Sequence, residues 1–337
     1  MSISSLSLIS AQRSTILRAQ EQLRKAEVEV SSGRYADVGT TLGATTGHSV
    51  TLYAESTSIK AQLTSNTLVT QRLSSMQDVL GTLSSSAQDL VNALIQAGGD
   101  KTTADTIATQ AKAALEQMSG ALNTTVNGIA LFSGTNTDTS PIDTSAAAKT
   151  ALADNATDAL DTWRANKLDA DPANDDFQAI LAANFDTVWR GNVSSANDAT
   201  VENRITPSET ITVSSSANSD GFQRLARAYS MLSTLATDTT LSTDERSTLY
   251  KTAINELNAG QQAVTSLQTD IGLRQDRVDS ANTRLQSKQT VIKASISSLE
   301  DVDPYEASTR VTMLTTQLEA AYSMTSQLKD LSLLNYL

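Results

Sequence analysis

The sequence contains no cysteine and a single histidine among its 337 residues. Without thiols, the chain can form neither disulfides nor cysteine-bound metal sites, and it has no cysteine nucleophile. Aromatic residues make up only 4% and proline only four residues, so a round core built on aromatic anchors is not expected. Serine, threonine, alanine and leucine dominate instead, which suits long helices that contact each other along narrow seams.

Basic residues are also scarce, and the formal net charge is -12. Nucleic acid is therefore not an expected partner, because phosphate backbones bind clustered lysine and arginine. No stretch approaches the roughly 18–20 apolar residues that span a bilayer, so we expect no membrane insertion. Residues 1–17 lack a basic segment followed by a clean apolar one, so no cleaved signal peptide is predicted. If the protein is exported, another route must recognise it.

The N-terminal segment is predicted to form one long helix from Ser5 to Ser32. Four apolar residues fall seven apart on it: Ile9, Ile16, Leu23 and Val30. The helix is predicted to end at Gly33, because glycine readily takes the left-handed conformation of a helix C-cap. Residues 33–49 hold four glycines and many threonines, which favours an irregular connection.

A second and a third helix are predicted next. The second carries apolar residues alternately three and four apart, the pattern of a coiled-coil seam: Leu73, Met76, Leu80, Leu83, Ala87, Leu90, Leu94 and Ala97. Gly98 and Gly99 interrupt it, and the third run covers about residues 103–125. The spacing predicts a helical pair joined at the two glycines.

The strongest periodicity lies nearer the C-terminus. Eight apolar residues follow one another at a constant spacing of seven: Tyr250, Leu257, Val264, Ile271, Val278, Leu285, Ile292 and Leu299. A repeat held this long implies a slight left-handed supercoil. Companion positions are diluted by residues such as Gly260 and Arg274. After Pro304 the 3-4 pattern resumes, with Val311, Leu314, Leu318 and Leu328.

The middle of the chain, about residues 132–220, lacks this order. It holds three of the four prolines and both tryptophans. Residues 209–217 alternate like a short strand. We expect an inserted β or α/β module between the helices.

Two segments were considered as chemical sites. His48 follows Gly43 and Gly47, but a phosphate-binding loop needs four residues between its glycines and then lysine, so a polar loop is the better interpretation. An acidic cluster could suggest calcium: Asp169, Asp171, Asp175 and Asp176. It lacks the glycine and the bidentate glutamate of a calcium loop, because Asn174 and Ile180 occupy those places. We therefore expect a solvated acidic loop.

Catalytic machinery is not marked anywhere in the sequence. A pair of carboxylates for glycoside hydrolysis could be assembled by folding, but nothing singles one out. Neither a nucleophile elbow nor a dinucleotide fingerprint occurs. We therefore predict no catalytic, cofactor-binding or metal-binding residues, and no cofactor.

The ordered motifs resemble the flagellin superfamily. They are the paired terminal helices, the stretch SSGR (31–34), and the closing LSLLNYL (331–337). NGIALFSGTNTDTSPI (127–142) resembles a turn found in the hook-associated protein 3 group, the hook–filament junction proteins. DVDPYEASTRVTMLTTQLEAAYSMTSQL (301–328) resembles the C-terminal segment of that group. The likeness covers about residues 1–135 and 222–337. The segment after SSGR departs from it, with one aspartate where the family has several.

The resemblance implies a mainly α, elongated flagellin-like rod of long coiled-coil helices from both chain ends, with a small β or α/β central domain. Three parts are expected. Residues 1–45 and 301–337 would form a terminal coiled coil in the inner tube of the flagellum. Residues 46–134 and 221–300 would form a helical rod, and 135–220 a variable outer domain.

The function implied is structural, without catalysis: subunits join the hook to the filament outside the cell, after export through the flagellar type III apparatus without a cleaved signal peptide. Expected partners are hook-associated proteins, flagellin, copies of the chain itself and an export chaperone. The expected subunit interface is Ile9, Ile16, Leu23, Val30, Val311, Leu314, Leu318, Leu328, Leu331, Leu334, Tyr336 and Leu337.

Two alternatives remain at this point. The chain could be a flagellin that forms the filament itself, because the terminal helices would serve either role. A rival of another class is a secreted enzyme or adhesin whose activity lies in residues 135–220, carried on a coiled-coil stalk.

Overall fold

The computed structural model describes the backbone of residues 2–168 and 176–334. It describes the side chains of residues 10–167 and 176–327. Its helices are α1 (Ser2–Ser32), α2 (Val38–Leu42), η1 (Gly43–Thr45), α3 (Thr46–Ala97), η2 (Lys101–Thr103), α4 (Ala104–Leu122), α5 (Ala146–Leu168), α6 (Phe177–Ala183), α7 (Phe185–Val188), the π-helical turn η4 (Trp189–Val193), α8 (Asp220–Leu235), α9 (Thr243–Glu300) and α10 (Pro304–Leu334). Its strands are β1 (Thr125–Val126), β2 (Ile129–Ala130), β3 (Glu202–Thr206) and β4 (Glu209–Thr212). The expected mainly α fold with long helices from both ends is confirmed.

The chain divides into two compact units, and the division falls within α3 and α9. The first unit comprises Met1–Ala61 and Arg284–Leu337, and the second comprises Gln62–Thr283. The three-part division expected from the sequence remains a prediction.

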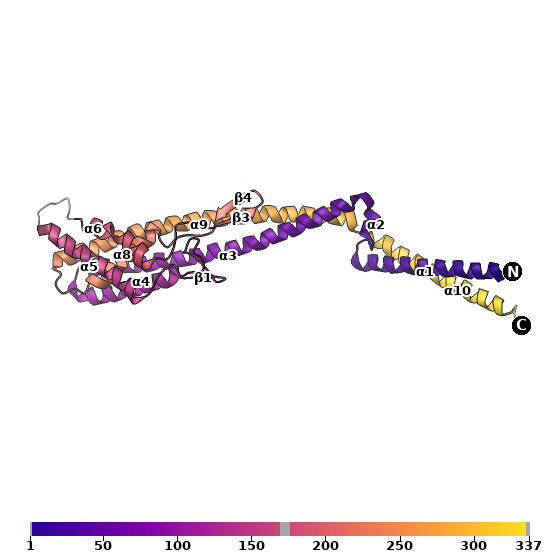
Figure 1. The fold of residues 1–337 in the computed structure, drawn as a ribbon, viewed down its shortest axis with the longest axis horizontal. Helices are drawn as coiled ribbons and strands as arrows, with labels where there is room; N and C mark the ends of the chain where they lie inside the picture. Colours follow the sequence, from indigo (N-terminus) through magenta and orange to yellow (C-terminus); the bar gives the residue numbers. More distant parts are fainter. Residues whose placement is uncertain (1, 169–175, 335–337) are drawn as a thin grey trace. The chain divides into compact units, whose positions relative to one another are not determined.

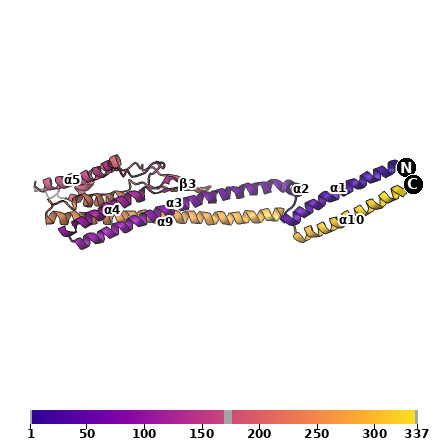
Figure 2. The same cartoon turned by 90° about the horizontal axis from the view of Figure 1, so that it is seen from below.

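In the second unit, α3 and α9 run side by side in opposite directions (Figure 1, Figure 2). Glutamine side chains of both helices donate across the pair: Gln275 to the Ser74 hydroxyl at 3.1 Å, Gln77 to the Gln268 carbonyl at 2.6 Å, and Gln261 to the Ser84 carbonyl at 3.3 Å. Every predicted residue of the α3 seam is buried, as are seven of the eight predicted on α9; Leu299 is half-buried.

Helix starts follow local chemistry. Ser242 and Glu245 form a capping box at the start of α9: the Ser242 amide donates to the Glu245 carboxylate at 2.7 Å, and the Glu245 amide to the Ser242 hydroxyl at 3.3 Å. Asp303 accepts the Tyr305 amide at 2.8 Å, with Pro304 as the first residue of α10. Such caps satisfy amides that have no partner within the helix.

Gly260 has a packing role that the heptad pattern did not indicate. A Cβ atom on Gly260 would lie 2.9 Å from Leu225 Cδ2 and 3.1 Å from the Gly221 carbonyl oxygen. A Cβ atom on Gly221 would in turn lie 3.0 Å from Ala263 Cβ. The two glycines therefore let α8 approach α9 more closely than any larger residue would permit.

The middle of the chain folds onto the same core. Of the two alternatives expected there, the structure shows the one with helices: α5 to α7 and η4 accompany the antiparallel β3–β4 hairpin. The expected strand over residues 209–217 is regular over Glu209–Thr212. Trp163, Phe177, Phe185 and Trp189 are buried in one apolar cluster with residues of α3, α4, α8 and α9.

Candidate functional site

In the first unit, α1 and α10 lie side by side as an antiparallel pair (Figure 1, Figure 2). Gln20 of α1 donates to the Tyr322 hydroxyl at 2.7 Å, and Arg310 of α10 donates to the Glu29 carboxylate at 2.9 Å. The helix α1 ends at Ser32, and Gly33 follows with φ of 70°, as the sequence predicted. The pair thus forms within one chain, between segments about 300 residues apart in sequence.

The seam between the two helices is narrow. Its fully buried apolar side chains within the described part are Ala26, Ala307, Leu314 and Leu318. Serine, threonine and charged residues fill most of the remaining surface of both helices. A seam of this size buries little apolar area, so it stabilises the pair only weakly.

The predicted interface residues divide into three groups. Leu314 and Leu318 are buried, and Ile16, Leu23 and Val311 are half-buried, so these five contribute to the pairing within the chain. Val30 is 43% exposed. The remaining predictions fall outside the described side chains: Ile9, Leu328, Leu331, Leu334, Tyr336 and Leu337.

A second set of apolar residues points outward, and sequence analysis missed it. Leu17 and Val28 of α1 are 57% and 41% exposed, and Met313 and Met324 of α10 are each 59% exposed. Both pairs are eleven residues apart, which is close to three turns, so each pair lies on one helix face. Tyr322, nine residues or about two and a half turns after Met313, lies on another side of α10, and its ring is 50% exposed. We call these five residues the outward face.

The outward face could have been found from a second periodicity. Leu17 directly follows Ile16 of the heptad seam, and Met313 directly precedes Leu314. An apolar neighbour beside each seam residue widens the apolar stripe beyond what one partner helix covers. Exposed apolar patches on proteins often mark contacts with other molecules.

Some of the charges near the helix pair are paired locally. The Arg24 guanidinium donates to the Glu21 carboxylate at 2.7 Å and holds the pKa of Glu21 below its usual range. Arg310 donates at 2.8 Å to Glu306, one turn earlier on α10. Exposed pairs of this kind contribute little to stability. The helix pair therefore presents apolar and hydroxyl-bearing side chains between locally paired charges.

Among the described residues, the sequence candidates for metal or phosphate chemistry form no site. His48 is exposed near the start of α3. The Asp176 carboxylate accepts the Gln178 and Ala179 amides at the start of α6 at 3.0 and 3.3 Å, whereas Asp169, Asp171 and Asp175 lie outside the described residues. Across residues 2–168 and 176–334, no group of three or more histidine, aspartate or glutamate side chains is placed to hold a metal ion.

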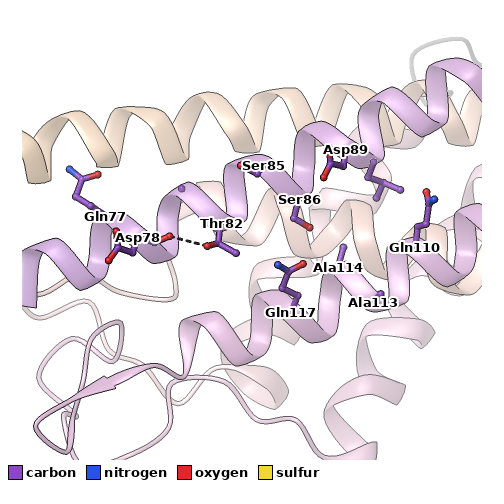
Figure 3. A pocket seen from close by; sticks show the side chains of 12 residues that line it. Gln77, Asp78, Thr82, Ser85, Ser86, Asp89, Gln110, Ala113, Ala114 and Gln117 are labelled. Carbon is purple, nitrogen blue, oxygen red and sulfur yellow. Dashed lines mark hydrogen bonds between the residues drawn. The ribbon is translucent and has the colours of Figure 1, made fainter.

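A cavity of about 830 Å³ lies between α3 and α4 in the second unit (Figure 3). It is lined by Gln77, Asp78, Gly81, Thr82, Ser85, Ser86, Asp89, Leu90, Gln110, Ala113, Ala114 and Gln117. Its two carboxylates, Asp78 and Asp89, are eleven residues apart on one helix, roughly 16 Å at the rise of an α-helix. That separation exceeds the roughly 5–10 Å between the acids of glycosidases, so the two do not form such a pair.

None of the described helices is both long enough and apolar enough to cross a lipid bilayer.

Comparison with known families matches both ends of the chain. The bacterial flagellin N-terminal helical region matches residues 3–137, and the bacterial flagellin C-terminal helical region matches residues 253–337. Together the two regions cover well over half of the chain. No curated protein matches the sequence.

Among solved structures, the chain is similar to a protein from Vibrio parahaemolyticus described as a flagellar hook-associated protein. The TM-score is 0.55 with 13% sequence identity, and the match covers 76% of this chain and 97% of the other. At this identity the match supports a shared fold.

Proposed function

This chain belongs to the bacterial flagellin superfamily and is a structural subunit of the flagellum, and we propose that within the flagellum it joins the hook to the filament. Segment 127–142, which resembles a turn of hook–filament junction proteins, favours the junction role. The similar solved structure is described as a flagellar hook-associated protein, which favours the same assignment.

The observation that carries the assembly role is the outward face. Leu17, Met313 and Met324 each expose more than half of their side chains. Complete burial of a large apolar side chain contributes about 1.5–3 kcal/mol, so covering the exposed halves of five such residues contributes roughly 4–7 kcal/mol per subunit. Neighbouring subunits would supply that cover, and the predicted residues Leu331, Leu334, Tyr336 and Leu337 would extend it.

Within one chain, Leu314 and Leu318 act differently from the outward face. They join α10 to α1 and so place Met313, which is 59% exposed, beside the seam. Ile16 and Leu23, which are half-buried, can contribute to both contacts. The proposed subunit interface therefore consists of an inner seam that forms the pair and an outer face that binds neighbours.

Substitutions on the outward face test this role directly. Leu17→Asp and Met313→Asp should leave the helical content and thermal stability of the monomer unchanged, because both side chains are already exposed. Incorporation into flagella should fall at least about tenfold, because a buried carboxylate without a partner is costly. Ile95→Asp, at a 63% exposed position in the second unit, is the matched control and should incorporate normally. Normal incorporation of both outward-face variants would contradict the proposal.

A flagellin that forms the filament itself is the second candidate, and the matched family regions favour it because both are flagellin regions. The two roles differ in where the protein lies. Immunolabelling of isolated flagella should show one band at the distal end of the hook for a junction subunit. Labelling along the whole filament would establish the flagellin role instead.

We also propose export through the flagellar type III apparatus with help from a chaperone, on the basis of family membership. Inactivation of that apparatus should leave the protein inside the cell, as measured by immunoblots of cell and medium fractions. Undiminished secretion would contradict this route.

A further inference from the structure

Two buried glutamates flank the connection that joins α1 to α3. Glu300 is the last residue of α9 and is 2% exposed, and Glu29 lies near the end of α1 and is 7% exposed. Acids this deeply buried are uncommon unless they are paired. The connection beside them has little apolar packing of its own, since α2 consists of exposed or half-buried residues.

Glu300 binds the connection to two long helices. Its carboxylate forms an ion pair with Arg34 of the connection and accepts the Ser49 hydroxyl of α3. The Tyr53 hydroxyl of α3 donates to the same carboxylate at 2.9 Å. The backbone adds a further bond, because the Tyr35 amide donates to the Glu300 carbonyl at 3.0 Å.

Glu29 binds the same short segment from the other side. One carboxylate oxygen accepts the Ala36 amide at 3.3 Å, and the other accepts Arg310 of α10 at 2.9 Å. Just beyond α9, the Val302 amide donates to the Gly33 carbonyl at 3.0 Å. Residues 34–36 thus lie between two carboxylates that come from α1 and α9.

We propose that Glu29 and Glu300 form a clamp that positions the α1–α10 pair on the ends of α3 and α9. A buried ion pair contributes little net stability, but removal of one partner leaves a costly unpaired charge. Charge-assisted hydrogen bonds are also directional, so they specify geometry where apolar contacts would permit sliding. The clamp therefore acts on the placement of the helix pair, and its effect on assembly rests on the function proposed above.

The clamp is tested in the purified full chain by hydrogen exchange. Glu300→Gln preserves side-chain shape but removes the charge that holds Arg34. The Tyr35, Ala36 and Val302 amides should then exchange on the order of tenfold faster, with rates in the second unit unchanged. Glu319→Gln, at an exposed acid of α10, is the matched control and should exchange as the wild type does.

Paired substitution separates the ion pair from general damage. Arg34→Gln leaves Glu300 buried without its cation, so the three amides should exchange faster than in the double variant Arg34→Gln/Glu300→Gln. Wild-type exchange in Glu300→Gln would overturn the clamp. A uniform increase across the chain would also overturn it, because that indicates global destabilisation.

The positioning role has a second readout in flagella. Glu300→Gln should incorporate at least about tenfold less than Glu319→Gln, although both proteins fold. Equal incorporation of the two variants would overturn the positioning role. Absence of the wild-type protein from flagella would overturn the proposed function instead, while the exchange result would still decide whether the clamp exists.

Discussion

The second unit and the α1–α10 pair are both helical, but they differ in the size and number of the apolar side chains that they bury. In the second unit, large side chains from several elements meet at 0–1% exposure: Leu73, Leu80, Phe132, Trp189, Phe222 and Tyr229. The terminal pair buries two alanines and two leucines within the described part, and each helix leaves apolar residues exposed. One region is therefore stabilised by its own core, whereas the other buries too little apolar area for comparable stability.

The intrinsic helix propensity of α1 and α10 does not compensate for the small apolar area that this pair buries. Isolated helices are marginal in water, and most helical stability in proteins comes from tertiary packing. The narrow seam around Leu314 and Leu318 supplies little of it. The terminal pair should therefore open at a much lower free energy than the second unit.

The largest expected loss of stability comes from creating a cavity in the core of the second unit. Leu80→Ala should lower the free energy of unfolding by about 2–5 kcal/mol, because Leu80 is fully buried and its neighbours relax only partly. Denaturant unfolding followed by circular dichroism measures this loss. Leu68→Ala, at a 53% exposed position of the same helix, is the control and should change stability by less than about 0.5 kcal/mol.

The next largest loss of stability is expected where α8 and α9 approach each other closely. Gly260→Val should cost about 1–3 kcal/mol, because its side chain would collide with Leu225 and with the backbone at Gly221. Gly120→Ala in α4 is the opposite case, since nothing lies within 4 Å of the added Cβ atom. That variant should gain up to about 1 kcal/mol from helix propensity. Equal effects from both glycines would contradict the packing described for α8.

Lowering the pH should destabilise the second unit, because the Glu245 carboxylate becomes protonated. A hydrogen bond from Arg164, together with one from the Ser242 amide, lowers the pKa of this carboxyl from 4.5 to about 2. Because the folded pKa is depressed, the stabilisation is complete above pH 4.5 and is lost as pH falls towards 2. Glu245→Gln keeps the capping box but not the charge, so the stability difference from wild type should shrink over that range. A difference independent of pH would contradict the ion pair.

The smallest effect on unfolding is expected in the terminal pair. Leu314→Ala removes a side chain of the seam that is buried, at 6% exposure. Global unfolding of the monomer should nevertheless change by less than about 0.5 kcal/mol, because the pair opens before the second unit unfolds. The same denaturant experiment as for Leu80→Ala checks this. Equal losses at Leu80 and Leu314 would abolish the proposed contrast.

The sequence predicted the parts of the fold that depend on local periodicity. The heptads from Tyr250 to Ile292 and the seam from Leu73 to Ala97 are buried, and the helix breaks at Gly33 and Gly98 occur where expected. These features depend on residues within a few turns of each other, so a single sequence contains them.

Long-range contacts could not be predicted in the same way. In the sequence, Gly260 only weakens the heptad pattern. Its role in the close approach of α8 and α9 depends on Gly221, which lies opposite it in the fold. Glu29 and Glu300 look like ordinary surface acids until folding brings Arg310 and Arg34 to them. A heptad also shows that a helix has a partner without showing which one. The sequence therefore predicts the seam residues as a subunit interface, and this stays a prediction, while Leu314 and Leu318 are buried between two helices of the same chain.

The central claim is that the α1–α10 pair is completed by neighbouring subunits. Hydrogen exchange of residues 10–32 and 304–327, compared between the purified monomer and isolated flagella, tests it most directly. We predict rapid exchange in the monomer and strong protection in the flagellum, while the core around Leu73 and Leu257 is protected in both. Equal protection of the terminal helices in the monomer and in the flagellum would contradict the account.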